Sequence, residues 1–172
     1  MEIAIIKGTA SDHIAIRRAD GSTVNTSFHK KGPVPHDAVH FFVESELDIA
    51  DGFWGMVARG RHPEEIQGIA KAAGHPSATR PSAPDPSIVP IVQAERIVEC
   101  FEADLWAGTS DPQTFRDVVK AGCEQSLVPD FPISDGAIDR IRRQIAELCV
   151  RWSALPIGES CQFEWREDGM VR

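Results

Sequence analysis

The sequence lacks the excess of basic residues that nucleic-acid binding requires. Its 172 residues include 18 Lys and Arg against 26 Asp and Glu, which gives a formal net charge of −8. Proteins bind phosphate backbones by neutralising them with clustered Lys and Arg side chains. The composition therefore argues against DNA or RNA as a partner, and the acidic surface mainly favours solubility.

Long hydrophobic runs are also missing. The chain begins Met-Glu-Ile-Ala-Ile-Ile-Lys-Gly, which has no basic leader and breaks off its apolar run at Lys7. A transmembrane helix needs about 20 apolar residues, and a signal peptide needs a basic start followed by about 7–15 apolar residues. We therefore expect no signal peptide, no contact with membranes and a cytoplasmic location.

Cysteine is scarce, and the usual nucleophile and nucleotide motifs are absent. The four cysteines form no C-x-x-C pair and stand far apart: Cys100, Cys123, Cys149 and Cys161. Reduced, structural thiols are the expected state of such cysteines in a cytosolic protein. No glycine-rich phosphate loop follows a predicted strand, and no G-x-S-x-G sequence occurs. These absences give no support to a nucleotide-binding protein or a serine hydrolase.

What the sequence does contain is the composition of an ordinary globular domain. Hydrophobic residues make up 42% of the chain and charged residues 26%, which is typical of proteins that bury a core. A length of 172 residues is close to that of one domain and short for two. We therefore predict a single domain over residues 1–172.

The first thirty residues alternate in polarity as strands do. Ile3 and Ile5 share one face of a strand, and Ile14 and Ile16 share one face of the next. Asp-Gly at 20–21 is a common hairpin turn before a third strand at 24–28. Alternation returns at 161–165, and a lone strand is unstable, so we expect this segment to join the N-terminal meander.

The intervening residues show helical periodicity and helix-capping residues. Proline at the first turn and apolar residues at intervals of three and four predict five helices, at about 36–47, 63–74, 91–105, 112–122 and 138–152. A Pro-rich segment at 75–90 is expected to run extended over the surface. The predicted fold is therefore α+β, with an antiparallel sheet of about four strands packed against about five helices.

Two histidines carry the clearest chemical signal. His36 and His40 lie one turn apart on the first predicted helix, so their side chains start about 6 Å apart on the same face and can bind one divalent ion. Glu44 lies a further turn along the same row. We group it with the metal site, as the carboxylate that accepts the other ring N–H of His40 and fixes its tautomer rather than as a third ligand.

The string His-Asp-Ala-Val-His at 36–40 resembles the H-E-x-x-H signature of zinc metalloproteases of the zincin type. In that signature two histidines bind zinc, and the Glu between them acts as general base on a metal-bound water. Asp37 stands where the signature has Glu. Its side chain is one methylene shorter, and this departure argues against peptidase activity because general-base geometry is strict.

A third ligand is needed, because catalytic zinc sites have three protein ligands and one open position. The spacing leaves the choice open among His29, His62, Glu64, Glu65, Glu95 and Glu99. The last two belong to a row of acids on the 91–105 helix that ends at Glu102. Such rows can bind metal between helices, but an exposed acidic stripe is the favoured interpretation.

Two functions follow from these patterns. The first is a divalent-metal-binding protein, with Zn²⁺ as the leading ion and a metal-dependent hydrolase as its most specific form. Asp37 would then be the base or support a histidine, and the substrate, a small molecule or a peptide, is not identified. The second is a non-catalytic interaction domain that forms a homodimer through helices 91–105 and 138–152. In that case His36 meets solvent in the first turn of its helix, and His40 is a half-buried, hydrogen-bonded structural residue.

Overall fold

The computed structural model describes residues 1–30, 32–73 and 83–166 of the chain. Within these residues four antiparallel strands form one sheet, accompanied by six α-helices, five of which have more than seven residues. The α+β class predicted from the sequence is confirmed, and so is the sheet of four strands.

The sheet has the order β3-β2-β1-β4, with β1 at Glu2–Ile6, β2 at Ser11–Arg17, β3 at Thr23–His29 and β4 at Ser160–Glu164. Ile3 faces Ile16 and Ile5 faces Ile14 across the first two strands, and all four side chains are buried. Cys161 extends this apolar row from β4, where it faces Ile5. Because alternate residues share a face, one face of the sheet covers the core. The last strand joins the N-terminal meander, as expected, and its partner there is β1.

The helices begin where the sequence places capping residues and prolines. They are α1 (His36–Glu46), α2 (Phe53–Ala58), α3 (Pro63–Ala73), α4 (Val89–Ala107), α5 (Pro112–Gln125) and α6 (Asp135–Ala154). Asp111 accepts the backbone N–H groups of Gln113 and Thr114 at the start of α5. Ser134 caps α6 in the same way. Side-chain caps of this kind satisfy the first N–H groups of a helix, which have no partner within it.

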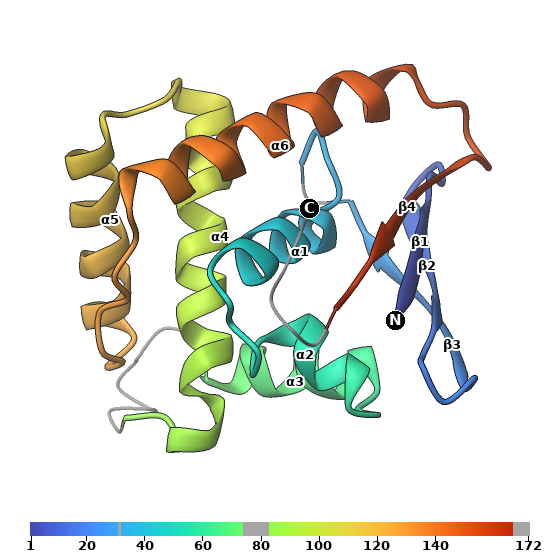
Figure 1. Cartoon of the computed structure of the whole chain (residues 1–172), viewed down its shortest axis with the longest axis horizontal. Coiled ribbons are helices and arrows are strands. Elements are labelled where there is room, and N and C mark those ends of the chain that lie inside the picture. Colours follow the sequence, from blue (N-terminus) through green and yellow to red (C-terminus); the bar gives the residue numbers. More distant parts are fainter. Residues whose placement is uncertain (31, 74–82, 167–172) are drawn as a thin grey trace.

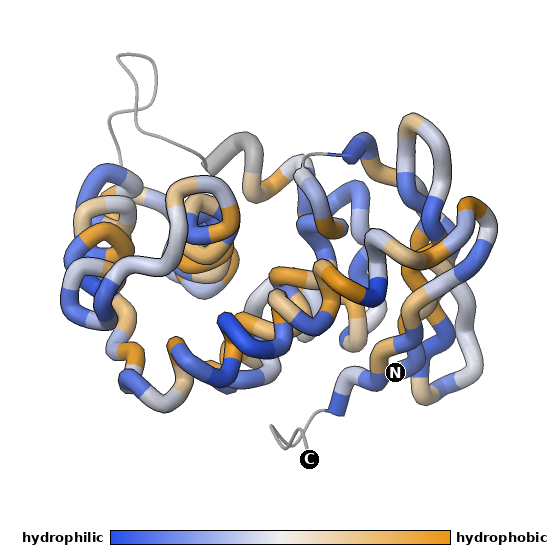
Figure 2. The backbone as a smooth tube through the Cα atoms, turned by 90° about the horizontal axis from the view of Figure 1, so that it is seen from above, coloured by the Kyte–Doolittle hydropathy of each residue, from blue (hydrophilic) through white to orange (hydrophobic). Residues whose placement is uncertain are grey.

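Helix α1 lies between the sheet and α4, with α5 beyond α4 and α6 crossing the top of the view (Figure 1). Phe41 of α1 contacts Phe163 and Trp165 at the end of the sheet, with ring centroids 5.0 and 6.2 Å apart. Hydrophobic and hydrophilic residues alternate along most elements (Figure 2), as expected of amphipathic segments around one core. The first helix is therefore enclosed from several sides.

Helix α2 was not predicted from the sequence, where residues 53–57 form only a short apolar stretch. It has six residues and begins directly after Gly52. Trp54 is fully buried, and Gly55 has no room for a side chain, because a Cβ there would lie 1.8 Å from the backbone oxygen of Ala50. Tight packing against the preceding turn, rather than periodicity, fixes this helix.

The apolar seams of α4 and α6 lie inside the chain's own core. The buried seam residues are Ile91, Ala94, Val98 and Phe101 on α4, and Ile138, Ile141, Ile145, Leu148 and Trp152 on α6. These two helices pack on α1, and α4 also packs on α5. A homodimer contact through α4 and α6 would therefore use their outer faces, and it stays a prediction that the mass in solution tests.

Of the Pro-rich segment at 75–90, residues 75–82 lie outside the described residues. Residues 86–88 form a 3₁₀ turn that leads directly into α4, with Asp85 capping Ser87. All four cysteines are free thiols, as expected, and only Cys149 among them is partly exposed. None of the described helices has both the length and the hydrophobicity that a membrane span requires.

Lys7 connects the sheet to the end of α6. Its Nζ donates to the backbone oxygens of Trp152 at 2.6 Å, Leu155 at 2.8 Å and Ser153 at 3.4 Å. The last carbonyls of a helix have no hydrogen-bond partner within it and carry partial negative charge. A lysine at this end supplies both the hydrogen bonds and a positive charge. This contact joins two parts of the chain that are more than 140 residues apart.

We expect Lys7→Met to lower the free energy of unfolding by about 2 kcal/mol, because it removes charge-assisted hydrogen bonds to partly buried carbonyls. Urea unfolding followed by circular dichroism measures the change. Lys120→Met is the control, since the Lys120 side chain is 57% exposed and a surface change of this kind shifts stability by no more than about 0.5 kcal/mol. Equal unfolding midpoints for the two variants would contradict the assigned role of Lys7.

Candidate metal centre

Helix α1 presents His36 and His40 on one face, as their spacing predicts. Pro35 precedes the helix with φ of −61° and ψ of 125°, the extended conformation common before a first turn. The two imidazole rings meet edge to face, with centroids 4.7 Å apart. The His40 side chain is 5% exposed and the His36 side chain 13%, so both rings are largely shielded from water.

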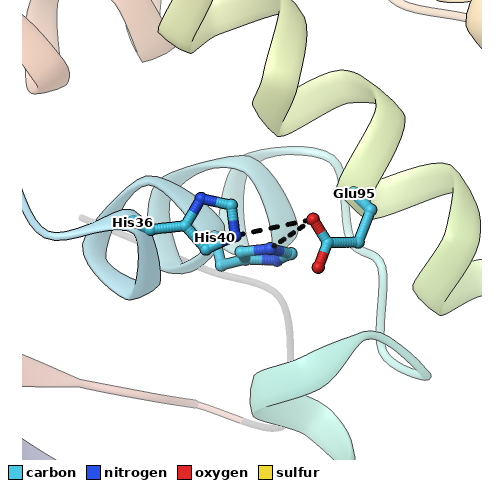
Figure 3. Close-up of side chains that lie close together, drawn as sticks. All are labelled: His36, His40 and Glu95. Carbon is cyan, nitrogen blue, oxygen red and sulfur yellow. Dashed lines mark ion pairs between the residues drawn. The ribbon is translucent and has the colours of Figure 1, made fainter. Parts of the chain in front are cut away.

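Glu95 reaches the same point from α4. Its Oε2 lies 3.5 Å from the Nε2 of His36 and 3.5 Å from the Nε2 of His40. Figure 3 shows the carboxylate pointing between the two rings from the facing helix. One ligand atom from each of the three residues lies within 4.8 Å of the others. This cluster of three could hold a metal ion.

The other nitrogen of each ring is held by a second carboxylate. His36 donates from Nδ1 to Oε1 of Glu102 at 2.8 Å, and His40 donates from Nδ1 to Oε1 of Glu44 at 2.9 Å. A carboxylate acceptor places the proton of a neutral imidazole on Nδ1 and leaves the lone pair on Nε2. Metal-binding histidines in proteins generally have this arrangement. Both available lone pairs therefore face Glu95.

Glu44 is the most deeply buried acid of the site. The residue has no exposed surface, and it accepts the backbone N–H groups of Phe53 at 3.0 Å and Trp54 at 2.8 Å in addition to His40. A buried carboxylate is stable only when donors surround it. The first turn of α2 supplies two of these donors, which explains why an acid is tolerated in the core.

The carboxylates of the site require positive charge nearby. Burial lowers the pKa of His40, but its interactions with Glu44 and Glu95 outweigh burial and raise the pKa to about 10. Burial also lowers the pKa of His36, but its contacts with Glu102 and Glu95 outweigh burial and raise the pKa. Burial raises the pKa of Glu95, yet the two histidines hold it well below its usual range. Two positive charges are therefore favoured among three carboxylates.

Either two protons or one divalent cation can supply these charges. With both rings protonated, the site carries two imidazolium groups beside Glu44, Glu95 and Glu102. With both rings neutral, the same positions present two lone pairs and a carboxylate oxygen to a cation. Because metal ligands must be deprotonated, binding of a cation releases the protons.

The other predicted site residues lie elsewhere. His29 bonds to Ser11, Glu64 accepts from Thr26, and Arg61 pairs with Glu65. The Nδ1 of His62 accepts the backbone N–H of Glu64, and Glu99 pairs with Arg96. Asp37 lines a small pocket next to His36, with a volume of about 20 Å³, which is room for about one water molecule. Of the six candidates for the third ligand, the structure brings Glu95 to the histidines.

The acidic row on α4 is not the exposed stripe that the sequence analysis favoured. The side chains of Glu95 and Glu102 are 24% and 25% exposed and turn toward the histidines, whereas that of Glu99 is 46% exposed. Residues seven apart lie on the same face of a helix after two turns. That spacing distinguishes Glu95 and Glu102 from Glu99, but only packing against α1 gives the pair a partner.

Comparison of the chain with protein-family models, curated proteins and solved structures finds no match. The assignment of the site therefore depends on its own geometry. Two histidines and one glutamate converge on a point, and two further glutamates hold the histidines in place.

Proposed function

We propose that this chain binds a divalent transition-metal ion through Nε2 of His36, Nε2 of His40 and a carboxylate oxygen of Glu95. The observation that carries the proposal is the convergence of both Nε2 atoms on one carboxylate oxygen, at 3.5 Å each. Atoms that lie 2.0–2.1 Å from a tetrahedral zinc ion are about 3.4 Å from one another. The two distances from Glu95 thus fit a shared metal ion, and all three ligand atoms lie within 4.8 Å of one another.

Without a metal ion, the protonated rings would donate from Nε2 directly to Glu95. The distances of 3.5 Å are long for such hydrogen bonds. A charge-assisted hydrogen bond from an imidazolium to a carboxylate is typically about 2.7–2.9 Å long, as found for Nδ1 of both rings. The Nε2 of His36 is buried and has no hydrogen-bond partner among the described residues. A buried nitrogen of this kind calls for a ligand, and a cation between the three groups provides one.

The donor set favours Zn²⁺ and is also suited to Fe²⁺ and Mn²⁺. Two imidazoles and a carboxylate occur at catalytic zinc sites and at the iron sites of oxygenases. Neither thiolates, which select softer ions, nor the many oxygen ligands that Ca²⁺ requires occur in this cluster. The ion is therefore expected from the first-row transition metals.

Titration of the metal-free protein, without a histidine tag, tests the proposal. Isothermal calorimetry with Zn²⁺, Fe²⁺ and Mn²⁺ should show one ion per chain for at least one of them. Co²⁺ should give the visible absorption bands of a tetrahedral or five-coordinate site. Failure of all four ions to bind at micromolar protein concentration would refute the proposed metal site.

A metal-dependent hydrolase is the more specific function that we propose for this centre. Three protein ligands leave a position for water, whose pKa a zinc ion lowers to about 7. Asp37 is the candidate base, because it follows His36 directly and lines the water-sized pocket beside it. A metal ion held by His36, His40 and Glu95 would activate water for hydrolysis of an ester or amide. Asp37 would accept the proton of that water and return it to the alcohol or amine that leaves as the C–O or C–N bond breaks.

For this activity we expect Asp37→Asn to lower kcat by about 100-fold and to leave the metal affinity unchanged, because an amide cannot accept the proton of the attacking water. The measurement is hydrolysis of a panel of activated esters and peptides by the Zn²⁺-loaded protein, with the metal-free protein as blank. Asp135→Asn is the matched control, since the Asp135 side chain is 67% exposed and pairs with Arg116. Equal rates for both variants, or no metal-dependent rate, would refute the hydrolase and leave the metal site standing.

A further inference from the structure

We propose that Glu44 is a positioning residue, which holds the His40 ring with Nε2 toward the metal by means of a clamp built from the turn at 48–52 and the first turn of α2. This inference rests on the proposed metal site. It assigns a purpose to a part of the chain that supplies no ligand itself. It also separates Glu44 from Glu102, which makes the same kind of contact with the other histidine.

The buried Glu44 carboxylate accepts three hydrogen bonds, one from the His40 ring and two from the first turn of α2. Oε1 of Glu44 accepts from Nδ1 of His40 at 2.9 Å and from the backbone of Phe53 at 3.0 Å, and Oε2 accepts from the backbone of Trp54 at 2.8 Å. Oε1 is thus fixed by two donors and Oε2 by one. A carboxylate held in this way cannot turn with the ring, so the ring must adopt the orientation that the carboxylate sets.

The turn before α2 is shaped to the Glu44 side chain. A Cβ at Gly52 would lie 2.5 Å from Cδ and 2.6 Å from Oε2 of Glu44, well inside van der Waals contact. Asp48, four residues earlier, adopts a φ of 53°, which non-glycine residues rarely do. The backbone therefore passes so close to the carboxylate that a side chain at position 52 would have to displace Glu44.

Trp54 adds a second connection between α2 and the site. Its Nε1 donates to the backbone oxygen of Asp37 at 2.8 Å, in the first turn of α1 and next to His36. Helix α2 thus contacts α1 beside one histidine through Trp54 and beside the other through Glu44. These contacts fix the part of α1 that carries His36 and His40. Core packing alone would not require hydrogen bonds at both of these positions.

Glu102 provides the internal comparison. It accepts from Nδ1 of His36 at 2.8 Å, but its side chain is 25% exposed and it belongs to the long helix α4. Water can reach this carboxylate and replace part of its contact with the ring. The two outer carboxylates are therefore unequal, with the ring of His40 more firmly fixed than that of His36.

The test compares Glu44→Gln with Glu102→Gln. A glutamine at 44 must turn its NH₂ group toward an N–H donor whichever way it is oriented, because both oxygens of Glu44 accept from N–H groups. A glutamine at 102 can still offer its oxygen to His36. We expect the affinity for Zn²⁺ to fall by about 10–100-fold in Glu44→Gln and by less than about tenfold in Glu102→Gln. Calorimetry and the Co²⁺ absorption spectrum measure both effects.

Two controls separate positioning from loss of fold. Lys7→Met destabilises the fold away from the site and should leave the affinity and the Co²⁺ spectrum unchanged. Gly52→Ala retains every ionisable group but displaces Glu44, so it should weaken binding as Glu44→Gln does. Folded Glu44→Gln protein with wild-type Zn²⁺ affinity and Co²⁺ spectrum would overturn the positioning role, whereas absence of binding in the wild type would refute the metal site itself.

A measurement on the unaltered protein applies even if these variants do not fold. In the Zn²⁺-loaded protein, the nitrogen chemical shifts of the His40 ring distinguish a metal-bound from a protonated nitrogen. We expect Nε2 to bind the metal and Nδ1 to carry the proton that is donated to Glu44. Binding through Nδ1, or rapid exchange of the Nδ1 proton with water, would overturn the inference.

Discussion

Replacing Glu95 by glutamine is expected to lower the affinity for Zn²⁺ by roughly 100-fold or more, which corresponds to about 3 kcal/mol of binding free energy. The amide retains the shape of the side chain but supplies no negative charge and is a much poorer ligand for the metal. His40→Ala should have at least as large an effect, because it removes a ligand atom. Calorimetric titration of each variant, prepared without a histidine tag, measures the loss.

Glu99→Gln is the matched control for Glu95→Gln. It lies one turn further along α4, and its side chain is 46% exposed and pairs with Arg96. We expect its Zn²⁺ affinity to equal that of the wild type, because Glu99 is not part of the cluster. Equal affinities for Glu95→Gln and Glu99→Gln would show that the ion binds elsewhere, and circular dichroism of both variants checks that the fold is retained.

The second large effect is a dependence of stability on pH that differs between the metal-free and metal-bound protein. A histidine whose pKa is raised on folding stabilises the fold at pH values below its unfolded pKa, and this contribution is lost as the pH rises toward the folded value. For His40 the unfolded value is 6.5 and the folded value about 10, and His36 shifts in the same direction. The metal-free protein should therefore lose stability steadily from pH 6.5 upward.

Bound metal should remove this decline, because the ion replaces the protons as the source of positive charge. Both states should lose stability in acid, since the lowered pKa of Glu95 makes its contribution disappear as the pH falls below about 4.5. Urea unfolding between about pH 3.5 and 8.5, with Zn²⁺ or with a chelator, measures both effects. Burial raises the pKa of the Cys100 thiol to about 12 and that of the Cys123 thiol to about 11. The series stops at pH 8.5 because these thiols also affect stability at higher pH.

The double variant His36→Gln/His40→Gln serves as the control for the pH series. It should show little change in stability between pH 6.5 and 8.5, because neither of the two raised groups is present. Metal-free wild-type protein whose stability stays constant or increases over this interval would contradict the assigned electrostatics. Calorimetry at pH 7 in buffers of different ionisation enthalpy also measures how many protons are released when the metal binds. We expect about two protons per ion.

Much of the fold follows from local patterns in the sequence. Alternating isoleucines predicted β1 and β2, and capping residues and prolines predicted the starts of α1, α3 and α5. The addition of β4 to the N-terminal meander followed from the need of a lone strand for a partner, but the sequence did not reveal that β1 is its neighbour. Helix α2 was missed because six residues hold too little periodicity. The close approach of Gly55 to Ala50 and the hydrogen bonds of Phe53 and Trp54 to Glu44 fix it, and neither leaves a periodic pattern in the sequence.

The candidate site was predictable only in the part that lies on one helix. The spacing of His36 and His40 places their rings together, and Glu44 follows by the same rule. Glu95 was one of six candidates, since the sequence does not reveal which turn of α4 packs against α1. Glu102 was assigned to an exposed stripe for the same reason, and its contact with His36 exists only after the helices pack.

Anomalous X-ray scattering from crystals of the Zn²⁺-loaded protein tests the metal centre most directly. We expect one strong peak at the zinc edge, at about 2.0–2.2 Å from Nε2 of His36, Nε2 of His40 and a carboxylate oxygen of Glu95. Glu44 and Glu102 should remain on Nδ1 of the two rings. Absence of a peak between α1 and α4, with both Nε2 atoms bonded directly to Glu95, would contradict the account.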